Sequence, residues 1–158
     1  LTVIKGGEPF TDGITITPAD IFAHVAAGGD LCSTTAINIQ EYEELFAKYS
    51  AEYDAVIHIN IGSGFSSCYQ NARLAAEEFS NVYVIDSQNL STGQGHVVLE
   101  ACRLAKTCDN MAEIVEKLNE FTSRVEASFV LDQLAYMAKG GRCSAVCGGP
   151  QRGGGYGV

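Results

Sequence analysis

Short apolar runs of β-branched residues alternate with segments of helical periodicity through most of the chain. Residues 55–61 and 82–85 are nearly continuous runs of Val and Ile, which is typical of strands covered on both faces. A helical segment separates them, so the two strands are predicted to be parallel and joined by a right-handed crossover. Residues 128–131 predict a third strand. Three strand–helix repeats predict an α/β fold with a mainly parallel sheet flanked by helices.

Two capping pairs define the start of two helices before the first of these strands. Thr17 and Asp20 flank a proline at the first helical position, which predicts a helix through about residue 27. Asn38 and Glu41 predict a second helix that runs to about residue 49. Further helices are predicted after the turn at 62–67, at about 94–106, from Asn110 onward, and as a short turn that ends at Lys139.

The composition is that of a globular domain with an acidic surface. Hydrophobic residues make up 46% of the chain and charged residues 18%. The 10 basic residues against 19 acidic ones give a net charge of -9, which repels a phosphate backbone at long range, so nucleic acid is not a predicted partner. A small anion can still bind, because oriented N–H groups act at short distance.

The cysteines and the hydropathy place the chain in a reducing compartment. The six cysteines contain no CxxC pair and several lie in apolar helical patterns, so we interpret them as reduced thiols. The sequence has no run of about 20 apolar residues and no signal segment, which predicts a cytoplasmic protein without a membrane span. No metal site, no cofactor and no catalytic residue are predicted.

The segment from 62 to 67 follows the first predicted strand and precedes a helix, which is where ligands bind in open α/β sheets. Gly62 and Gly64 allow the backbone to approach a ligand closely, and the helix start presents unpaired N–H donors. The segment therefore fits an anion of carboxylate or phosphate size. Hydroxyl groups that could reach the same crevice belong to Ser63, Ser66, Ser67, Thr34 and Thr35.

Three other interpretations of this segment remain open. In the simplest one, the glycines only make a tight turn and Ser66 only caps the helix. In the second, Gly62-x-Gly64 with Asp86 at the end of the next strand marks a Rossmann-like nucleotide or dinucleotide site, although Ser67 replaces the third glycine.

The third alternative is an α/β-hydrolase. The order Ser66, Asp86, His96 is that of a hydrolase triad, but Cys68 replaces the closing glycine of the nucleophile elbow. Asp86 also fits a role as a cap for the loop from Ser87 to Thr92. His24 and His58 lie in apolar stretches and are interpreted as core or edge residues rather than catalytic bases.

Six short segments resemble elements of the DegV family of bacterial fatty-acid-binding proteins and follow one another in the same order. The family's TSQPS, SSGLSGTYQSA, VIDS, GLG and KGGR elements and its YxDG run are the points of similarity. They correspond to residues 34–38, 61–72, 84–87, 93–95, 139–142 and 9–13, respectively. Asn38, Gly62 and the pair Ser67-Cys68 depart from the family pattern, which leaves the details of the head-group contacts open.

The resemblance implies a carrier without chemistry of its own, which holds a long-chain fatty acid of roughly C14 to C18 and presents it to a fatty acid kinase. In the family, the positions of Thr34 and Ser66 bind the carboxylate, and Ser63 and Gly64 are expected to support them. Arg142 resembles an arginine near the pocket opening where the kinase docks. The same arginine also fits a solvated cation at a helix end.

The resemblance also sets the expected domain organisation. Residues 1–147 are expected to form the DegV-type lipid-binding domain, incomplete at both ends and without the second domain of the family. Residues 148–158 are mostly glycine and are expected to be a tail or linker. We therefore expect either a fragment of a longer protein or a pocket that is open.

Overall fold

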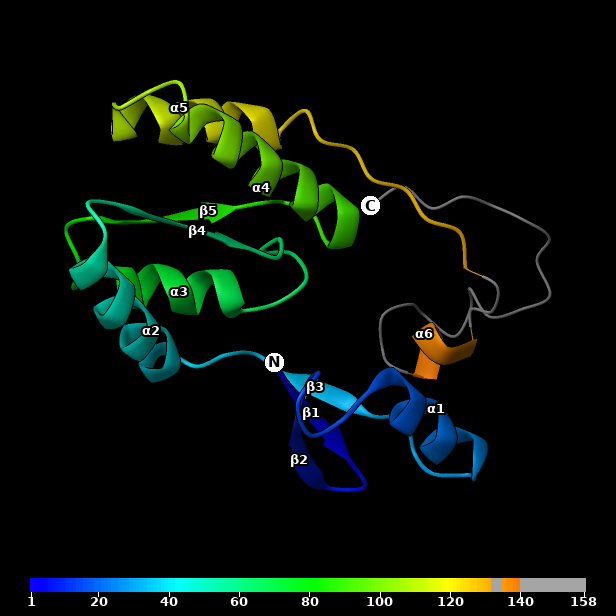
Figure 1. The fold of residues 1–158 in the computed structure, drawn as a ribbon. Helices are drawn as coiled ribbons and strands as arrows, with labels where there is room; N and C mark the ends of the chain where they lie inside the picture. The colour runs from blue at the N-terminus through cyan, green and yellow to red at the C-terminus, as the bar shows by residue number, and fades with distance from the viewer. Residues whose placement is uncertain (132–134, 140–158) are drawn as a thin grey trace. The chain divides into compact units, whose positions relative to one another are not determined.

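The computed structural model describes residues 1–131 and 135–139 (Figure 1). These residues fall into two compact units: Ile37–Ala127 is one, and Leu1–Ala36 with the described residues from Ser128 onward is the other. Arg142, the KGGR residues after Lys139 and the glycine-rich segment 148–158 lie outside the described residues.

The larger unit is built on two parallel strands. Strands β4 (Val56–Asn60) and β5 (Val82–Asp86) pair in register from Val56 opposite Val82 to Asn60 opposite Asp86. The two predicted strands and their parallel pairing are confirmed. Their last residues lie side by side at the same edge of the sheet, because the strands point the same way.

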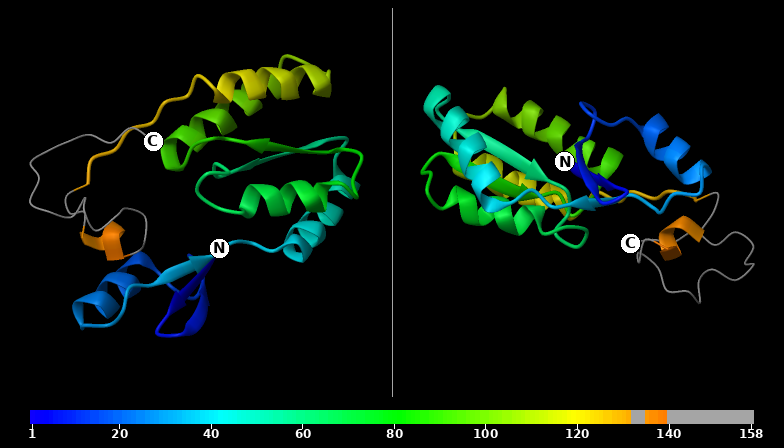
Figure 2. Two further views of the ribbon diagram at one scale, coloured as in Figure 1. Left: turned by 180° about the vertical axis from the view of Figure 1, so that it is seen from behind. Right: turned by 90° about the horizontal axis from the view of Figure 1, so that it is seen from below.

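Helices cover both faces of this sheet, which confirms the predicted α/β class (Figures 1 and 2). Helices α2 (Ile39–Glu52) and α3 (Cys68–Ala76) lie on one face, and α4 (Ser91–Ala105) and α5 (Met111–Thr122) on the other. Helix α2 begins with the predicted capping box of Asn38 and Glu41. Helix α5 begins at Asn110, whose side chain accepts hydrogen bonds from the N–H groups of Ala112 and Glu113.

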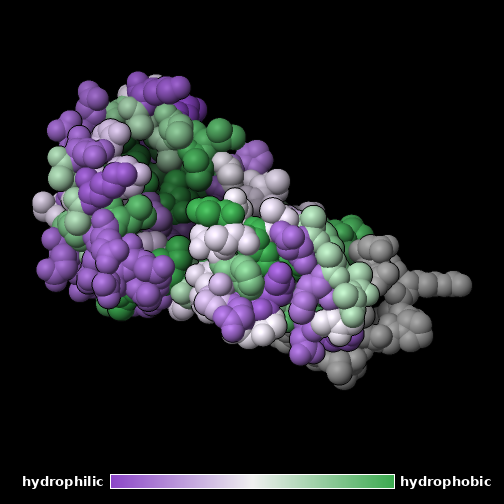
Figure 3. All heavy atoms as spheres, turned by 60° about the horizontal axis from the view of Figure 1, so that its bottom comes forward, coloured by the Kyte–Doolittle hydropathy of each residue, from purple (hydrophilic) through white to green (hydrophobic). Residues whose placement is uncertain are grey.

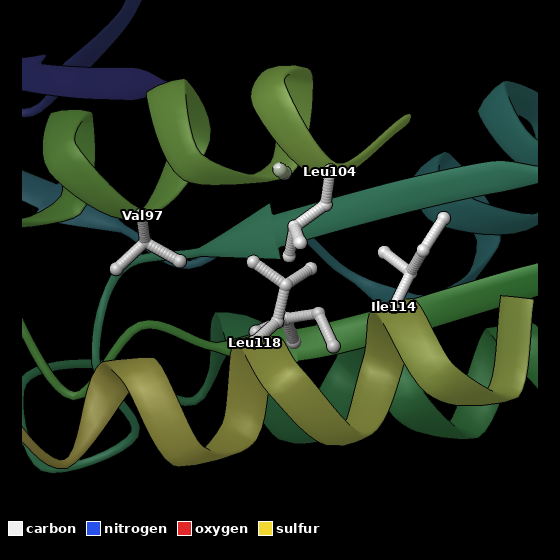
Figure 4. Packing of buried hydrophobic residues seen from close by; sticks show 6 residues of the cluster. Val97, Leu104, Ile114 and Leu118 are labelled. Atoms are coloured by element: carbon white, nitrogen blue, oxygen red, sulfur yellow. The ribbon is translucent and has the colours of Figure 1, made fainter. Parts of the chain in front are cut away.

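One buried hydrophobic cluster of this unit lies between β5 and the two helices α4 and α5 (Figure 4). Helix α5 contributes Ile114 and Leu118, and the side chains of Val97 and Leu104 from α4 point toward them. Each such side chain stabilises the fold by roughly 1.5–3 kcal/mol when it leaves water. The most deeply buried members are Ile85, Val97, Leu104, Ile114 and Leu118.

His58 lies on the opposite face of the sheet, among aromatic residues of α2. Its ring meets those of Tyr42 and Phe46 edge-on, with centroid distances of 5.3 Å and 5.2 Å. This confirms the interpretation of His58 as a core histidine. Burial lowers the pKa of His58 from its ordinary value of 6.5, because the charged imidazolium loses its hydration.

His58 should make the fold sensitive to mild acid. The lowered pKa means that the unfolded chain binds a proton at His58 near pH 6.5 and the folded chain does not, so the free energy of unfolding falls as the pH drops below that value. The substitution His58→Phe should flatten this dependence. Urea unfolding of both proteins at about pH 7.5 and about pH 5.5 gives the free energy of unfolding at each pH. An equal fall in this free energy between the two pH values for both proteins would contradict the prediction.

The smaller unit contains an antiparallel sheet that the sequence pattern did not predict. Strands β1 (Thr2–Lys5), β2 (Glu8–Thr11) and β3 (Ser33–Thr35) pair in the order β2-β1-β3. Gly6 and Gly7, with φ of 58° and 87°, make the turn between β1 and β2. These strands are only three or four residues long, which is too short for a clear apolar alternation.

Helix α1 (Pro18–Ala26) begins with the predicted capping box, in which Thr17 and Asp20 satisfy each other's backbone N–H groups. The predicted strand at 128–131 is wrong: the structure places these residues outside any strand, and Val130 is 92% exposed. An apolar run becomes a strand only where a neighbouring strand receives its backbone hydrogen bonds. The short helix α6 (Ala135–Lys139) follows.

The surface over α2 is polar. Figure 3 shows hydrophilic residues gathered over this helix, where Glu41, Glu44 and Lys48 are exposed.

In the described part of the chain, none of the helices combines the length and the apolar character needed to cross a bilayer.

Candidate functional site

The segment between β4 and α3 is a tight turn at the carboxyl edge of the parallel sheet. The N–H of Phe65 donates to the carbonyl oxygen of Gly62 over 2.9 Å, which closes the turn. The N–H of Gly62 donates to the carbonyl oxygen of Asn89 over 2.8 Å. Helices α3 and α4 both begin at this edge, so the positive ends of their dipoles lie on the side where an anion would bind (Figure 1).

The two glycines of the turn have different roles. A methyl group added at Gly62 would lie 2.8 Å from the carbonyl carbon of Gln88 and 2.9 Å from the nitrogen of Asn89, so this glycine allows two loops to pack backbone to backbone. A methyl group added at Gly64 would meet nothing within 4 Å. Among the described residues, Gly64 therefore has open space beside it, and it is exposed like Ser63, so the turn leaves backbone here that a ligand can approach.

Ser66 partly fills the capping role that one interpretation gave it. Its Oγ accepts a hydrogen bond from the N–H of Cys68 over 3.2 Å, whereas Ser67, the N-cap residue of α3, makes no side-chain capping bond. A hydroxyl that accepts through a lone pair still has its own O–H to donate. Ser66 is half-buried and Ser63 and Gly64 are exposed, so the turn presents donors that fit a carboxylate oxygen.

The carboxylate of Asp86 is hydrogen-bonded to the turn and to the loop that follows β5. Its Oδ1 accepts from the N–H of Gln88 over 2.9 Å, which confirms the interpretation of Asp86 as a loop cap. The same oxygen accepts from the N–H of Ser63 over 3.0 Å. In a dinucleotide site this carboxylate would bind a ribose hydroxyl; here one of its two oxygens, Oδ1, accepts from backbone N–H groups.

The backbone at Ser66 also differs from that of a hydrolase elbow. The nucleophile of such an elbow lies on a sharp, strained turn. In residues 1–131 and 135–139, positive φ angles outside glycine occur at Gln88 (54°) and Ser91 (51°), and Ser66 is not among them. The strain of this region therefore lies in the loop after β5, next to the turn.

The loop from 86 to 91 is anchored by a buried polar network that the sequence did not reveal. Ser87 is completely buried, and its Oγ donates to the carbonyl oxygen of Asn89 over 2.9 Å. The side-chain amide of Asn89 donates to the carbonyl oxygen of Val125 over 3.0 Å. Gly93 leaves no space for a side chain beside Asn89. Gly93 belongs to the segment that resembles the GLG element, and this glycine was the sequence feature that pointed to the packing.

A second buried polar group lies at the end of β4. The side-chain amide of Asn60 donates to the hydroxyl oxygen of Tyr42 over 2.9 Å, and Asn60 is only 4% exposed. Within residues 1–131 and 135–139, its Oδ1 has no hydrogen-bond partner. Burial, followed by the nearby Cys68 thiol, raises the pKa of Tyr42 to about 12, so this hydroxyl remains protonated.

Thr34 lies in the other unit. It is exposed in β3, opposite Val3 of β1, and so stands in a strand that the sequence pattern did not predict. Ser63, Gly64 and Ser66 come together in the larger unit. The meeting of Thr34 with Ser66, like the role of Arg142, stays a prediction.

The sequence matches one family model over residues 1–149, described as "Uncharacterised protein, DegV family". A DegV domain-containing protein of Clostridium acetobutylicum is 28% identical over 151 residues, which cover 94% of this chain and 53% of that protein. The protein DegV of Bacillus subtilis is 30% identical over 149 residues, which cover 92% and 53%. The chain thus spans about half the length of the curated relatives it matches.

Solved structures give the same result. A DegV family protein of Thermus thermophilus, whose structure is described by its fatty acid binding, has a TM-score of 0.80 and 29% identity, with 89% of this chain and 51% of that one covered. DegV of Bacillus subtilis, described as a fatty acid binding protein, has a TM-score of 0.78 and 29% identity, with 91% and 52% covered.

Proposed function

This chain belongs to the DegV family, and from that premise we propose that it binds a long-chain fatty acid by the carboxylate. The observation that carries the proposal is the glycine turn at the carboxyl edge of β4, where Ser63, Gly64 and Ser66 offer donors beside the start of α3. Two relatives above 25% identity that share this fold are described as fatty-acid-binding proteins, which supports the same ligand class here.

We assign the head group to two hydroxyls. Ser66 donates its O–H to one carboxylate oxygen, and Thr34 donates to the same head group from β3. Ser63 and the backbone at Gly64 complete the set of donors. A carboxylate accepts several hydrogen bonds at once, so these few donors fix its orientation.

The hydrocarbon tail supplies most of the affinity in this scheme. Each methylene that leaves water contributes roughly 0.8 kcal/mol, so an acyl chain of about C14 to C18 outweighs the head-group bonds. The head group then determines which end of the ligand is held at the turn. The relatives are about twice as long as this chain. The proposal therefore concerns only the part of the tail pocket that the residues of this chain form.

The carrier performs no chemistry of its own in this proposal. It presents the bound carboxylate to a cytoplasmic fatty acid kinase, and Arg142 contributes to the surface where the kinase docks. Ser66 has a hydrogen-bonding role here, since its Oγ already accepts the N–H of Cys68.

The proposal predicts that lipid copurifies with the protein. Protein extracted under denaturing conditions should release a fatty acid of roughly C14 to C18 at near one per chain, detected by mass spectrometry. The control is Ser66→Ala from the same expression host, which should release less. Lipid-free wild-type protein that also fails to take up palmitate would contradict the proposal.

Two assays separate the proposal from its rivals. Calorimetric titration with NAD should give no saturable binding, whereas a nucleotide site would give it. Short p-nitrophenyl esters should stay intact, whereas a hydrolase would cleave them and lose this activity in Ser66→Ala.

A further inference from the structure

Asp86 occupies a position that links the two loops at the carboxyl edge of the sheet. It is the last residue of β5 and lies opposite Asn60, the last residue of β4. One oxygen of its carboxylate accepts from Gln88 in its own loop and from Ser63 in the glycine turn, 23 residues away. We infer that Asp86 is a positioning residue for the carboxylate site, a role that rests on the proposed function.

The bond to Ser63 fixes the turn where its shape matters for binding. Ser63 and Gly64 follow Gly62, whose N–H is already held by Asn89. With two successive N–H groups bound to the loop after β5, the turn has one orientation relative to α3. This orientation determines where the backbone at Gly64 and the hydroxyl of Ser66 meet an acyl carboxylate.

The loop that carries Asp86 is rigid enough to act as a brace. Ser87 and Asn89 are buried and hydrogen-bonded to each other, and Asn89 is tied to Val125 after α5. Gln88 and Ser91 keep left-handed backbone conformations that cost free energy and persist only where the surroundings hold them. The brace thus connects the core of α4 and α5 to the ligand-binding turn.

The acceptor oxygen of Asp86, and not its negative charge, holds the turn in position. Substitutions can separate these two properties. Asp86→Asn keeps an oxygen at the same place and loses the charge. Asp86→Glu keeps the charge and moves the oxygen away by one methylene. Asp86→Ala removes both. Asn110→Ala removes the cap of α5 and serves as a stability control, because the side chain of Asn110 accepts from Ala112 and Glu113 of its own helix.

The experiment measures palmitate affinity by calorimetry and the exchange rate of the Ser63 amide by NMR on the full chain. Asp86→Ala and Asp86→Glu should weaken palmitate binding by about tenfold and speed Ser63 exchange, because the N–H of Ser63 loses its acceptor oxygen. Asp86→Asn should stay within about threefold of the wild type. Asn110→Ala should lower the melting temperature and leave both readouts unchanged.

Weakened binding in Asp86→Asn together with wild-type affinity in Asp86→Glu would overturn the inference, because the charge and not the position of the oxygen would then be the active property. Unchanged palmitate affinity in Asp86→Ala would overturn it as well. If Asp86→Ala does not fold, the comparison of the Asn and Glu variants decides alone. A wild-type chain that binds no palmitate would overturn the proposed function together with this inference, whereas the other outcomes leave wild-type binding intact.

Discussion

The double substitution Thr34→Ala with Ser66→Ala should weaken palmitate binding by roughly a hundredfold or more. A hydrogen bond to a charged group contributes about 1.5–3 kcal/mol, and the proposal assigns one such bond to each hydroxyl. Because about 1.4 kcal/mol corresponds to a tenfold change in affinity, two lost bonds give this range. Isothermal titration calorimetry with palmitate measures the effect.

Two controls assign the loss to the carboxylate. Thr35→Ala with Ser67→Ala removes the neighbouring hydroxyls, and Ser67 makes no capping bond, so palmitate affinity should change little. Hexadecanol has the same tail without the carboxylate, and its binding should be the same in the wild type and in Thr34→Ala with Ser66→Ala. Equal losses for palmitate and hexadecanol would instead indicate that the substitutions damage the fold.

The central strands and the helices of the larger unit could be predicted because each had its own local signal. The runs at 55–61 and 82–85 had enough β-branched residues to indicate buried strands, and the capping pairs marked the helix starts. The predicted strand at 128–131 is also mainly apolar, although Val130 is its one β-branched residue, and it is not a strand. Composition describes what a segment can bury, but pairing depends on which backbone lies next to it, and that is a property of the whole fold.

The candidate site could be predicted only in part, for the same reason. The strand, the glycine turn and the helix placed Gly62, Gly64 and Ser66 at the carboxyl edge from local pattern alone. The bond between Asp86 and Ser63 spans 23 residues, and the close packing of Gly62 on Gln88 depends on the conformation of a second loop. Such contacts have no local periodicity, so a single sequence does not contain a signal for them.

Gly62 and Gly64 lie two residues apart in the turn. Alanine at Gly62 should lower the free energy of unfolding, whereas alanine at Gly64 should not. Gly62→Ala places a methyl group 2.8 Å from the backbone of Gln88, where neither partner is a flexible side-chain end, so the two loops must separate. Overpacking of this kind costs about 1–3 kcal/mol of unfolding free energy. It should also weaken palmitate binding, because Gly62 is held by Asn89 and leads into Ser63.

Gly64→Ala is the matched control, since its methyl group enters open space and its φ is not positive. The free energy of unfolding should stay the same or rise by about 0.4–1 kcal/mol, because alanine restricts the unfolded chain. Urea unfolding of the two variants checks the stability, and calorimetry with palmitate checks the site. If the backbone at Gly64 approaches the carboxylate, palmitate affinity falls in this stable variant. A Gly62→Ala protein as stable as the wild type would contradict the packing of the turn against the loop after β5.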